Sequence, residues 1–203
     1  GTAYSNMAEV RDKEANLGKA IAAYQEALRI YTSEAFPVQY ATTQNNLGNA
    51  YRNLAEVRDK EENLGKAIEA YQEALKIRTR DAFPVDYAMT ENNLGTAYSN
   101  MAEVRDKEAN LGRAIAAYQE ALSIYTRDAF PMNYAGAQNN LGNAYAAIAE
   151  VRDKEANLAR AIEAYKEALT IYTVDAFPDL HQLVIENLRR AEAKLGAAAP
   201  PDE

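Results

Sequence analysis

The sequence repeats itself every 47 residues, and this period constrains the fold more than any other feature. The tetrapeptide Asn-Asn-Leu-Gly occurs at 45–48, 92–95 and 139–142. Segments 48–94 and 95–141 differ at 13 positions, so 34 of their 47 residues are identical. A fixed period of roughly 20 to 50 residues is typical of a stacked array. Each unit of such an array buries its apolar face against its neighbours.

Composition excludes several classes of protein. Apolar residues make up 48% of the 203 residues, which is enough for a continuous core. The absence of cysteine rules out disulfides and thiolate metal sites. Apolar stretches are short and interrupted by charge, so no targeting or membrane segment is predicted. We therefore expect a cytoplasmic protein that does not bind membranes.

The net charge of −8 is spread along the chain, without a basic stripe. Nucleic-acid binding depends on neutralising phosphates, so an acidic chain of this kind is not expected to bind DNA or RNA. Anionic membrane surfaces are disfavoured for the same reason. The acidity favours solubility and a mild preference for basic partners.

Each unit is predicted to contain two helices. The first begins at Pro84 and ends near Val104, because apolar side chains recur between them at helical spacing. Asp106 is the expected N-cap of the second helix. In the preceding unit, Asp59 and Glu62 have the spacing of a capping box. Both helices are expected to span about 18 to 20 residues, or roughly 30 Å at 1.5 Å per residue.

Two sets of glycines recur within the predicted helices. The first set lies on or beside the apolar stripe of the first helices, and its members are Gly48, Gly95 and Gly142. Because glycine inside a helix costs about 1 kcal/mol relative to alanine, we expect another helix to approach closely there. The second set is Gly18, Gly65 and Gly112. Ala159 replaces glycine at that position in the last unit, so packing is not expected to require it.

The repeated residues resemble the motif of the tetratricopeptide-repeat family. One unit carries Leu94, Gly95 and Tyr98, then Ala114, Tyr118 and Ala121, then Pro131. Matching sets recur at Leu47, Gly48, Tyr51, Ala67, Tyr71, Ala74 and Pro84, and at Leu141, Gly142, Tyr145, Ala161, Tyr165, Ala168 and Pro178. The 47-residue unit exceeds the usual 34 or so, as in the branch that includes kinesin light chains and many bacterial regulatory proteins. The resemblance implies a right-handed α-solenoid of antiparallel helix pairs, with about four repeats and a C-terminal capping helix.

The period also divides the chain. Residues 1–196 are expected to form a single array of an N-terminally truncated repeat (1–36), full repeats (37–83, 84–130 and 131–177) and a capping helix (178–196). Arg189 and Glu192 replace a glycine and a tyrosine of the apolar seam, so no further helix should cover that surface. Residues 197–203 are expected to be disordered. The array begins in mid-unit, so either it is cut from a longer one or another molecule covers this end.

No catalytic or metal-binding constellation is found in the sequence. All 18 aromatic residues fall on the 47-residue spacing and are interpreted as core residues. His181 is the only histidine and stands where other units have tyrosine, so we interpret it as a packed side chain of the capping helix. Zinc would need several more ligands, and nucleophilic catalysis would need an activated nucleophile. We expect no enzymatic activity and no cofactor.

Asparagine pairs in the first helices carry the functional prediction. Asparagine is a mediocre helix former, yet it recurs in mid-helix. In tetratricopeptide arrays the first helices line the concave surface, where asparagine ladders are similar to those that bind a peptide backbone. One asparagine of each pair could instead tie neighbouring helices together. The predicted peptide-binding residues are Asn45, Asn49, Arg52, Asn53, Asn92, Thr96, Ser99, Asn100, Asn139 and Asn143.

The preferred function is a non-enzymatic scaffold that binds a protein or an extended peptide on this concave face. An amide side chain can pair with a peptide N–H and C=O without recognising side chains. A basic clamp for acidic C-terminal tails is not evident, because Asn45 and Asn92 occupy places where lysine would be needed. Two alternatives are open: a scaffold that self-assembles through its N-terminal end, and a regulatory segment of a larger signalling protein.

Overall fold

The computed structural model describes residues 13–197, which fold into eight α-helices without a β-strand in that range. The contacts group into two compact units, Gly1–Arg105 and Asp106–Glu203. The prediction of an all-α fold built from helix pairs is confirmed. The N-terminal end invoked for self-assembly and the predicted tail from residue 198 onward lie outside the described residues.

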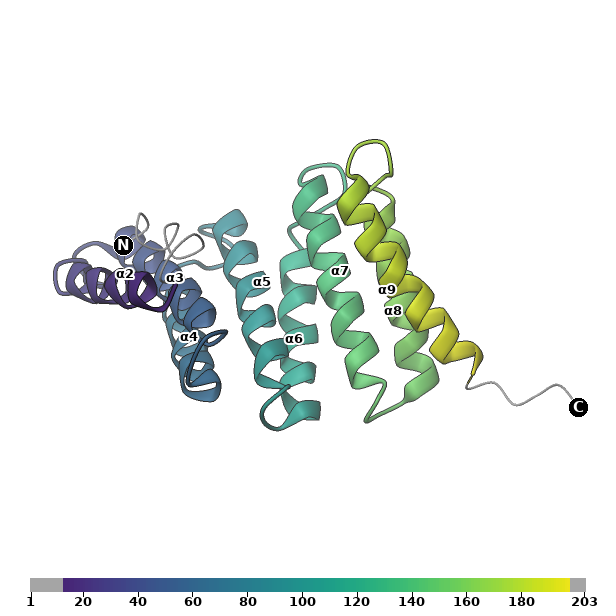
Figure 1. The fold of residues 1–203 in the computed structure, drawn as a ribbon. Coiled ribbons are helices and arrows are strands. Elements are labelled where there is room, and N and C mark those ends of the chain that lie inside the picture. The colour runs from purple at the N-terminus through teal and green to yellow at the C-terminus, as the bar shows by residue number, and fades with distance from the viewer. Residues whose placement is uncertain (1–12, 198–203) are drawn as a thin grey trace, which may run out of the picture. The chain divides into compact units, whose positions relative to one another are not determined.

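The described part of the first unit contains four helices, shown in purple to teal in Figure 1. They are α2 (Lys13–Leu28), α3 (Pro37–Leu54), α4 (Lys60–Leu75) and α5 (Pro84–Met101). Each helix packs against the next one along the chain, and α3 also touches α5. The shared core contains Leu17, Ile21, Leu47 and Leu54. Short connections between packed neighbours make these helices antiparallel pairs.

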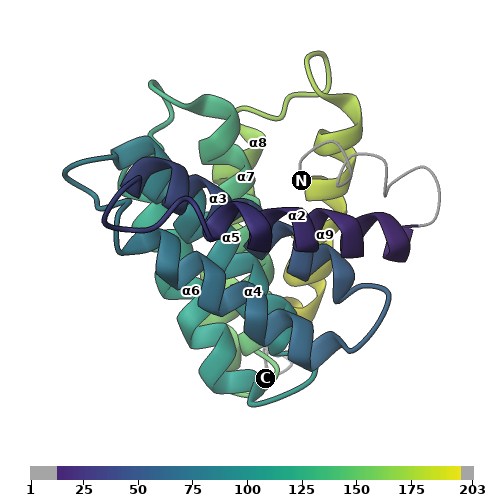
Figure 2. The same cartoon turned by 90° about the vertical axis from the view of Figure 1, so that its left-hand side faces the viewer.

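The second unit repeats this arrangement and ends in the capping helix. Its helices are α6 (Lys107–Leu122), α7 (Pro131–Ile148), α8 (Lys154–Leu169) and α9 (Pro178–Gly196), which Figure 2 shows from a second direction. Again α7 packs on α6 and α8, while α9 packs on α8 and touches α7. Arg189 and Glu192 of α9 are exposed, as predicted. His181 is half-buried, and its Nδ1 donates to the carbonyl oxygen of Tyr172 at 2.7 Å.

The first helices match the prediction more closely than the second ones. A proline opens each described first helix, and α3, α5 and α7 have 18 residues. The second helices have only 16 residues. Tyr125 therefore lies in the turn after α6, although it is still buried. In each turn after a second helix, a threonine hydroxyl accepts a hydrogen bond from the backbone N–H three residues further along the chain. The N–H of Ala129, for example, donates to Oγ1 of Thr126 at 3.2 Å. Such a side-chain bond competes with the helical hydrogen bonds and ends the helix.

The loop between the two helices of a unit differs from the predicted capping box. Asp59 is the N-cap of α4, but its backbone is left-handed with φ 44° and its side chain makes no capping hydrogen bond. Its carboxylate instead accepts from Arg58 at 3.1 Å, and Glu62 accepts from Lys66 at 2.6 Å. Asn63 donates to the backbone carbonyl of Arg58 at 2.9 Å. The capping-box prediction is thus wrong, because a buried asparagine inside the helix holds the loop.

Replacing Asn63 by alanine should destabilise the protein by about 0.5–1.5 kcal/mol, because the hydrogen bond from its side chain to the carbonyl oxygen of Arg58 is lost. Asn63 is only 4% exposed, so water does not readily replace the lost bond. The matched control is Glu62→Ala, since the exposed Glu62 already is alanine in the other units. Urea unfolding followed by circular dichroism measures both variants. Equal stability of the two would contradict the role given to Asn63.

The two sets of glycines have different environments, as predicted. A Cβ atom on Gly48 would lie 2.6 Å from Cε1 of Tyr71, and one on Gly142 would lie 2.6 Å from Cε1 of Tyr165. The close approach thus comes from a tyrosine of the second helix. A Cβ atom on the glycines of the other set would meet nothing within 4 Å; these are Gly18, Gly65 and Gly112.

Candidate functional site

The first helices present a row of polar side chains one turn beyond the asparagine pairs. In the first unit, the hydroxyl of the buried Tyr71 donates to Oδ1 of Asn49 at 2.7 Å. The guanidinium of Arg52, one turn further along α3, lies beside this phenol. The second unit has the same bond, from Tyr165 to Oδ1 of Asn143 at 2.8 Å. Each unit therefore fixes one asparagine of this row on a tyrosine of the second helix.

A pocket of about 270 Å³ lies beside Arg52 in the first unit. It is bordered by side chains of α3, α4 and α5, including Asn100, and by an ion pair in which Lys60 donates to Glu103 at 2.6 Å. Nη2 of Arg52 donates to Oδ1 of Asn53 at 3.4 Å, whereas its buried Nε has no partner among the described residues. A buried donor without a partner is costly and therefore favours an acceptor supplied from outside.

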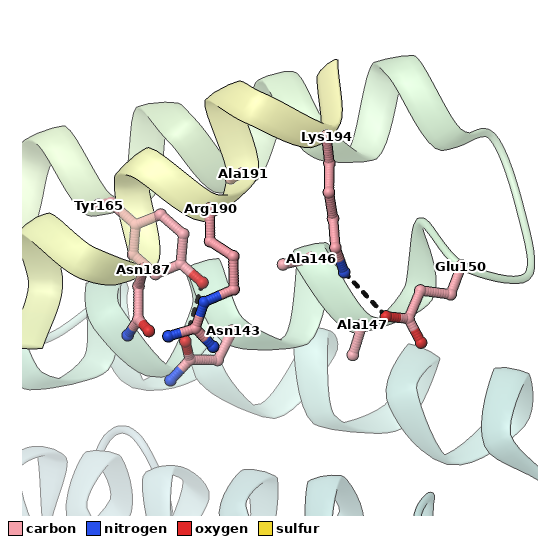
Figure 3. Close-up of a pocket in the computed structure, with 9 residues that line it drawn as sticks. All are labelled: Asn143, Ala146, Ala147, Glu150, Tyr165, Asn187, Arg190, Ala191 and Lys194. Carbon is pink, nitrogen blue, oxygen red and sulfur yellow. Dashed lines mark hydrogen bonds and ion pairs between the residues drawn. The ribbon is translucent and has the colours of Figure 1, made fainter. Parts of the chain in front are cut away.

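The second unit has a pocket of about 190 Å³ at a different position of the repeat, between α7 and α9 (Figure 3). The guanidinium of Arg190 lies over the bond between Tyr165 and Asn143. Among the described residues, Arg190 makes no hydrogen bond or ion pair. Lys194, also in the pocket, donates to Glu150 at 3.0 Å. This pocket thus offers a guanidinium and amide groups to a ligand.

Electrostatics at both pockets follow from burial. Burial raises the pKa of Tyr71 to about 12, and the neighbouring Arg52 partly opposes the shift. Burial likewise raises the pKa of Tyr165, which Arg190 partly opposes. Glu150 has a lowered pKa, because it accepts hydrogen bonds from Lys107 and Lys194. At neutral pH both tyrosines are therefore un-ionised donors. Arg52 and Lys60 face Glu56 and Glu103 in the first pocket, whereas Arg190 and Lys194 face only Glu150 in the second.

The asparagine pairs themselves tie helices together. Asn45 is 4% exposed, and its Oδ1 accepts from Asn93 of α5 at 3.3 Å. Oδ1 of Asn139 accepts from Asn187 of α9 in the same way, also at 3.3 Å. Asn45 is thus not available to a ligand, which corrects its assignment to the peptide-binding set. The physical reason is that its amide faces the neighbouring first helix.

The other predicted residues occupy more open positions. Asn49, Arg52, Asn53 and Asn100 are half-buried, and Asn143 is exposed. Oγ1 of Thr96 donates to the carbonyl of Asn92 within α5 at 3.1 Å. Three more predicted residues are half-buried, and each of them interacts with other groups of the chain: Asn92, Thr96 and Ser99. The pocket of the first unit contains two of the predicted residues, Arg52 and Asn100. The pocket of the second unit contains one of them, Asn143.

The sequence prediction missed the charged residues of both pockets. Lys60 and Glu103 belong to the recurring Ala-Glu-Val-Arg-Asp-Lys-Glu segment, and neither was among the predicted binding residues. Arg190 and Lys194 lie in the capping helix, where they replace threonine and asparagine of the earlier unit. A position-by-position comparison of α9 with α5 would have revealed this gain of positive charge.

Chemically, these pockets can donate and accept hydrogen bonds and bind anionic or carbonyl oxygens. Among residues 13–197, no group of three or more histidine, aspartate or glutamate side chains is placed to hold a metal ion. None of the described helices is both long enough and apolar enough to cross a membrane. The fold and this polar face define an all-α helical-repeat protein.

Comparison with known proteins identifies the repeat. Residues 41–81 match the family model of the tetratricopeptide repeat, and the motif residues of that segment return in the other units. Residues 41–81 therefore form a tetratricopeptide repeat. No curated protein matches it in sequence. Proteins of this family are typically non-enzymatic scaffolds that bind other proteins.

Two solved structures resemble the chain. The crystal structure of MamA protein has a TM-score of 0.55 and 20% sequence identity, covering 100% of this chain and 97% of that chain. The crystal structure of BtubC (BKLC) from P. vanneervenii has a TM-score of 0.46 and 22% identity, covering 98% and 82%. The likeness to MamA supports the helical-repeat solenoid fold.

Proposed function

We propose that this chain binds an extended segment of a partner protein along the polar face of its first helices. The observation that carries the proposal is the pocket beside Arg52, where a buried Nε lacks an acceptor within the described chain. The free guanidinium of Arg190 supports the same role in the second unit. An extended segment supplies carbonyl oxygens along its whole length, so it can pair with donors that stand at different positions of the two units.

Amide groups beside the two arginines complete the proposed recognition. Tyrosine hydroxyls occupy Oδ1 of Asn49 and Asn143, so the NH2 groups of these two residues remain to donate to a ligand. Hydrogen bonds from a charged donor are roughly twice as strong as neutral ones. The arginines would therefore contribute most of the affinity, and the asparagines would align the bound backbone.

Substitutions at the two arginines test this function. A phage-displayed peptide library selected on the immobilised chain supplies a probe, and fluorescence anisotropy measures its Kd. Arg52→Ala and Arg190→Thr introduce residues that other repeats carry at the same positions, Ala146 and Thr96. Each should weaken binding about tenfold or more, because a hydrogen bond to a charged group contributes about 1.5–3 kcal/mol.

The control removes a cation from outside the proposed face. Lys76→Ser eliminates an exposed lysine that follows α4 and introduces the residue found at Ser123. Its Kd should equal that of the unmodified chain. A selected peptide that binds equally well to the Arg52→Ala, Arg190→Thr and double variants would refute the proposed face.

A further inference from the structure

A recurring ion pair joins each second helix to the first helix that follows it. The lysine at the start of the second helix donates to a glutamate just beyond the end of that first helix. The pairs are Lys13 with Glu56 at 2.5 Å, Lys60 with Glu103 at 2.6 Å, and Lys107 with Glu150 at 2.7 Å. Each lysine of this series therefore has a carboxylate of the chain as its partner.

The series is broken at its next member, Lys154, which opens α8. The place of the glutamate, just beyond α9, is taken by Ala197. Glu150 does not substitute for it, because its carboxylate already accepts from Lys107 and Lys194. Within residues 13–197, Lys154 makes no hydrogen bond or ion pair. An ammonium group that pairs elsewhere in the array is thus left without a carboxylate here.

A pocket of about 360 Å³ lies beside Lys154. Its other charged residues are Lys194 and Glu150, and its apolar wall consists of Ala146, Ala149 and Leu158. Two lysines thus face one glutamate, so the pocket has an excess of positive charge next to apolar surface.

The equivalent pocket of the first unit, beside Arg52, is balanced in charge. Two repeats of 47 residues separate Lys60 from Lys154 and Asn100 from Lys194. In that first pocket the two cations face two glutamates, one of which is Glu103, the partner of Lys60. The gain of Lys194 and the loss of a glutamate at Ala197 therefore distinguish the second unit.

The pocket beside Lys154 continues the pocket that contains Arg190. Both are lined by Ala146, Glu150 and Lys194, and Figure 3 shows Lys194 pointing toward Glu150. A segment bound beside Arg190 therefore reaches Lys154 with its neighbouring residues.

We propose that the pocket beside Lys154 binds an acidic side chain of the partner segment. The carboxylate accepts from Lys154, as Glu103 accepts from Lys60, and the aliphatic part of the side chain contacts Leu158 and Ala149. A pocket with an apolar wall and few polar groups is suited to such an amphipathic side chain. This inference rests on the proposed function and adds the chemical class of one recognised residue.

The test measures how strongly binding depends on a carboxylate of the ligand. A peptide selected from a phage-displayed random library on the unmodified chain is the probe, and each of its acidic residues is changed in turn to the corresponding amide. One such change should raise the Kd about fivefold, the upper range for an exposed ion pair. With Lys154→Ala the same change should have no effect. Ala197→Glu should also abolish the dependence, because the chain then supplies its own carboxylate to Lys154.

The control removes a lysine of α8 that lies outside the pocket. Lys166→Gln introduces the residue found at Gln72 and Gln119, and it should keep the fivefold difference. The same carboxylate dependence in the unmodified, Lys154→Ala and Ala197→Glu chains would overturn the inference.

The outcome also separates this inference from the proposed function. A peptide that needs Arg52 and Arg190 but none of its own carboxylates would leave the polar face standing and overturn the acidic subsite. A carboxylate dependence that requires Lys154, in a peptide unaffected by both arginine substitutions, would support the subsite and refute the polar face. A library that yields no binding peptide would overturn both.

Discussion

Replacing Gly48 by alanine should destabilise the first unit, although alanine is the better helix former. The added Cβ would lie 2.6 Å from Cε1, 2.8 Å from Cδ1 and 2.9 Å from Cζ of Tyr71. Tyr71 is fully buried and its hydroxyl is held by Asn49, so the ring has no room to retreat. Overpacking of this kind costs typically about 1–3 kcal/mol, which exceeds the helix-propensity gain of about 1 kcal/mol at most sites.

The second unit provides a replicate, and the open glycines provide the control. Gly142→Ala meets Tyr165 in the same way and should be destabilising to a similar degree. Gly65→Ala should instead stabilise by up to about 1 kcal/mol, because only the helix-propensity gain remains. The urea unfolding midpoints of the three variants test this prediction. If Gly48→Ala and Gly65→Ala shift the midpoint in the same direction, the packing explanation fails.

Raising the pH from 10 to 12 should remove about 2 kcal/mol of stability through Tyr71 alone. Burial raises its folded pKa to about 12, compared with an ordinary value of 10.0. Below pH 10 both folded and unfolded states keep the proton, so stability is fully present. Between pH 10 and pH 12 the unfolded chain ionises first, and the folded state loses about 1.36 kcal/mol for each pH unit. Tyr165 should add a loss of the same sign.

The variant Tyr71→Phe separates this effect from the general alkaline titration of lysines. At pH 8 it should cost about 1 kcal/mol, because the hydrogen bond to Asn49 is lost. Between pH 10 and pH 12 it should lose less stability than the unmodified chain. Free energies of unfolding from urea titrations at each pH give the comparison. Parallel pH profiles for the two proteins would show that Tyr71 is not the responsible group.

Most of the fold could be predicted from the sequence because its signals are local and repeated. The proline positions correctly placed the start of each described first helix, and the apolar period identified its buried face. The contrast between Gly48 and Gly65 was also readable, since replacement by Ala159 in the last unit marked the tolerant position. A capping-box spacing was misleading, because Asp59 adopts a left-handed backbone that Asn63 stabilises.

The candidate site was predictable only in part. The sequence placed Asn45 and Asn49 one turn apart on the same helix, but it did not show which of them faces a neighbouring helix. Tertiary structure decided that Asn45 is buried against Asn93 and that Asn49 accepts from Tyr71. It also brought Arg190 over Tyr165 from a helix that sequence reasoning treated only as a cap.

The sequence by itself determined that this chain is an array of 47-residue helix pairs, because periodic apolar burial and proline-started helices are encoded within each unit. Only the tertiary structure decided where the breaks in that period act. Arg78 and Arg190 each replace a residue of the repeat, yet one is buried in a network between α3 and α5 while the other faces a pocket. The physical reason is that a side chain's burial and partners depend on the neighbouring helices, which a single unit's sequence does not contain.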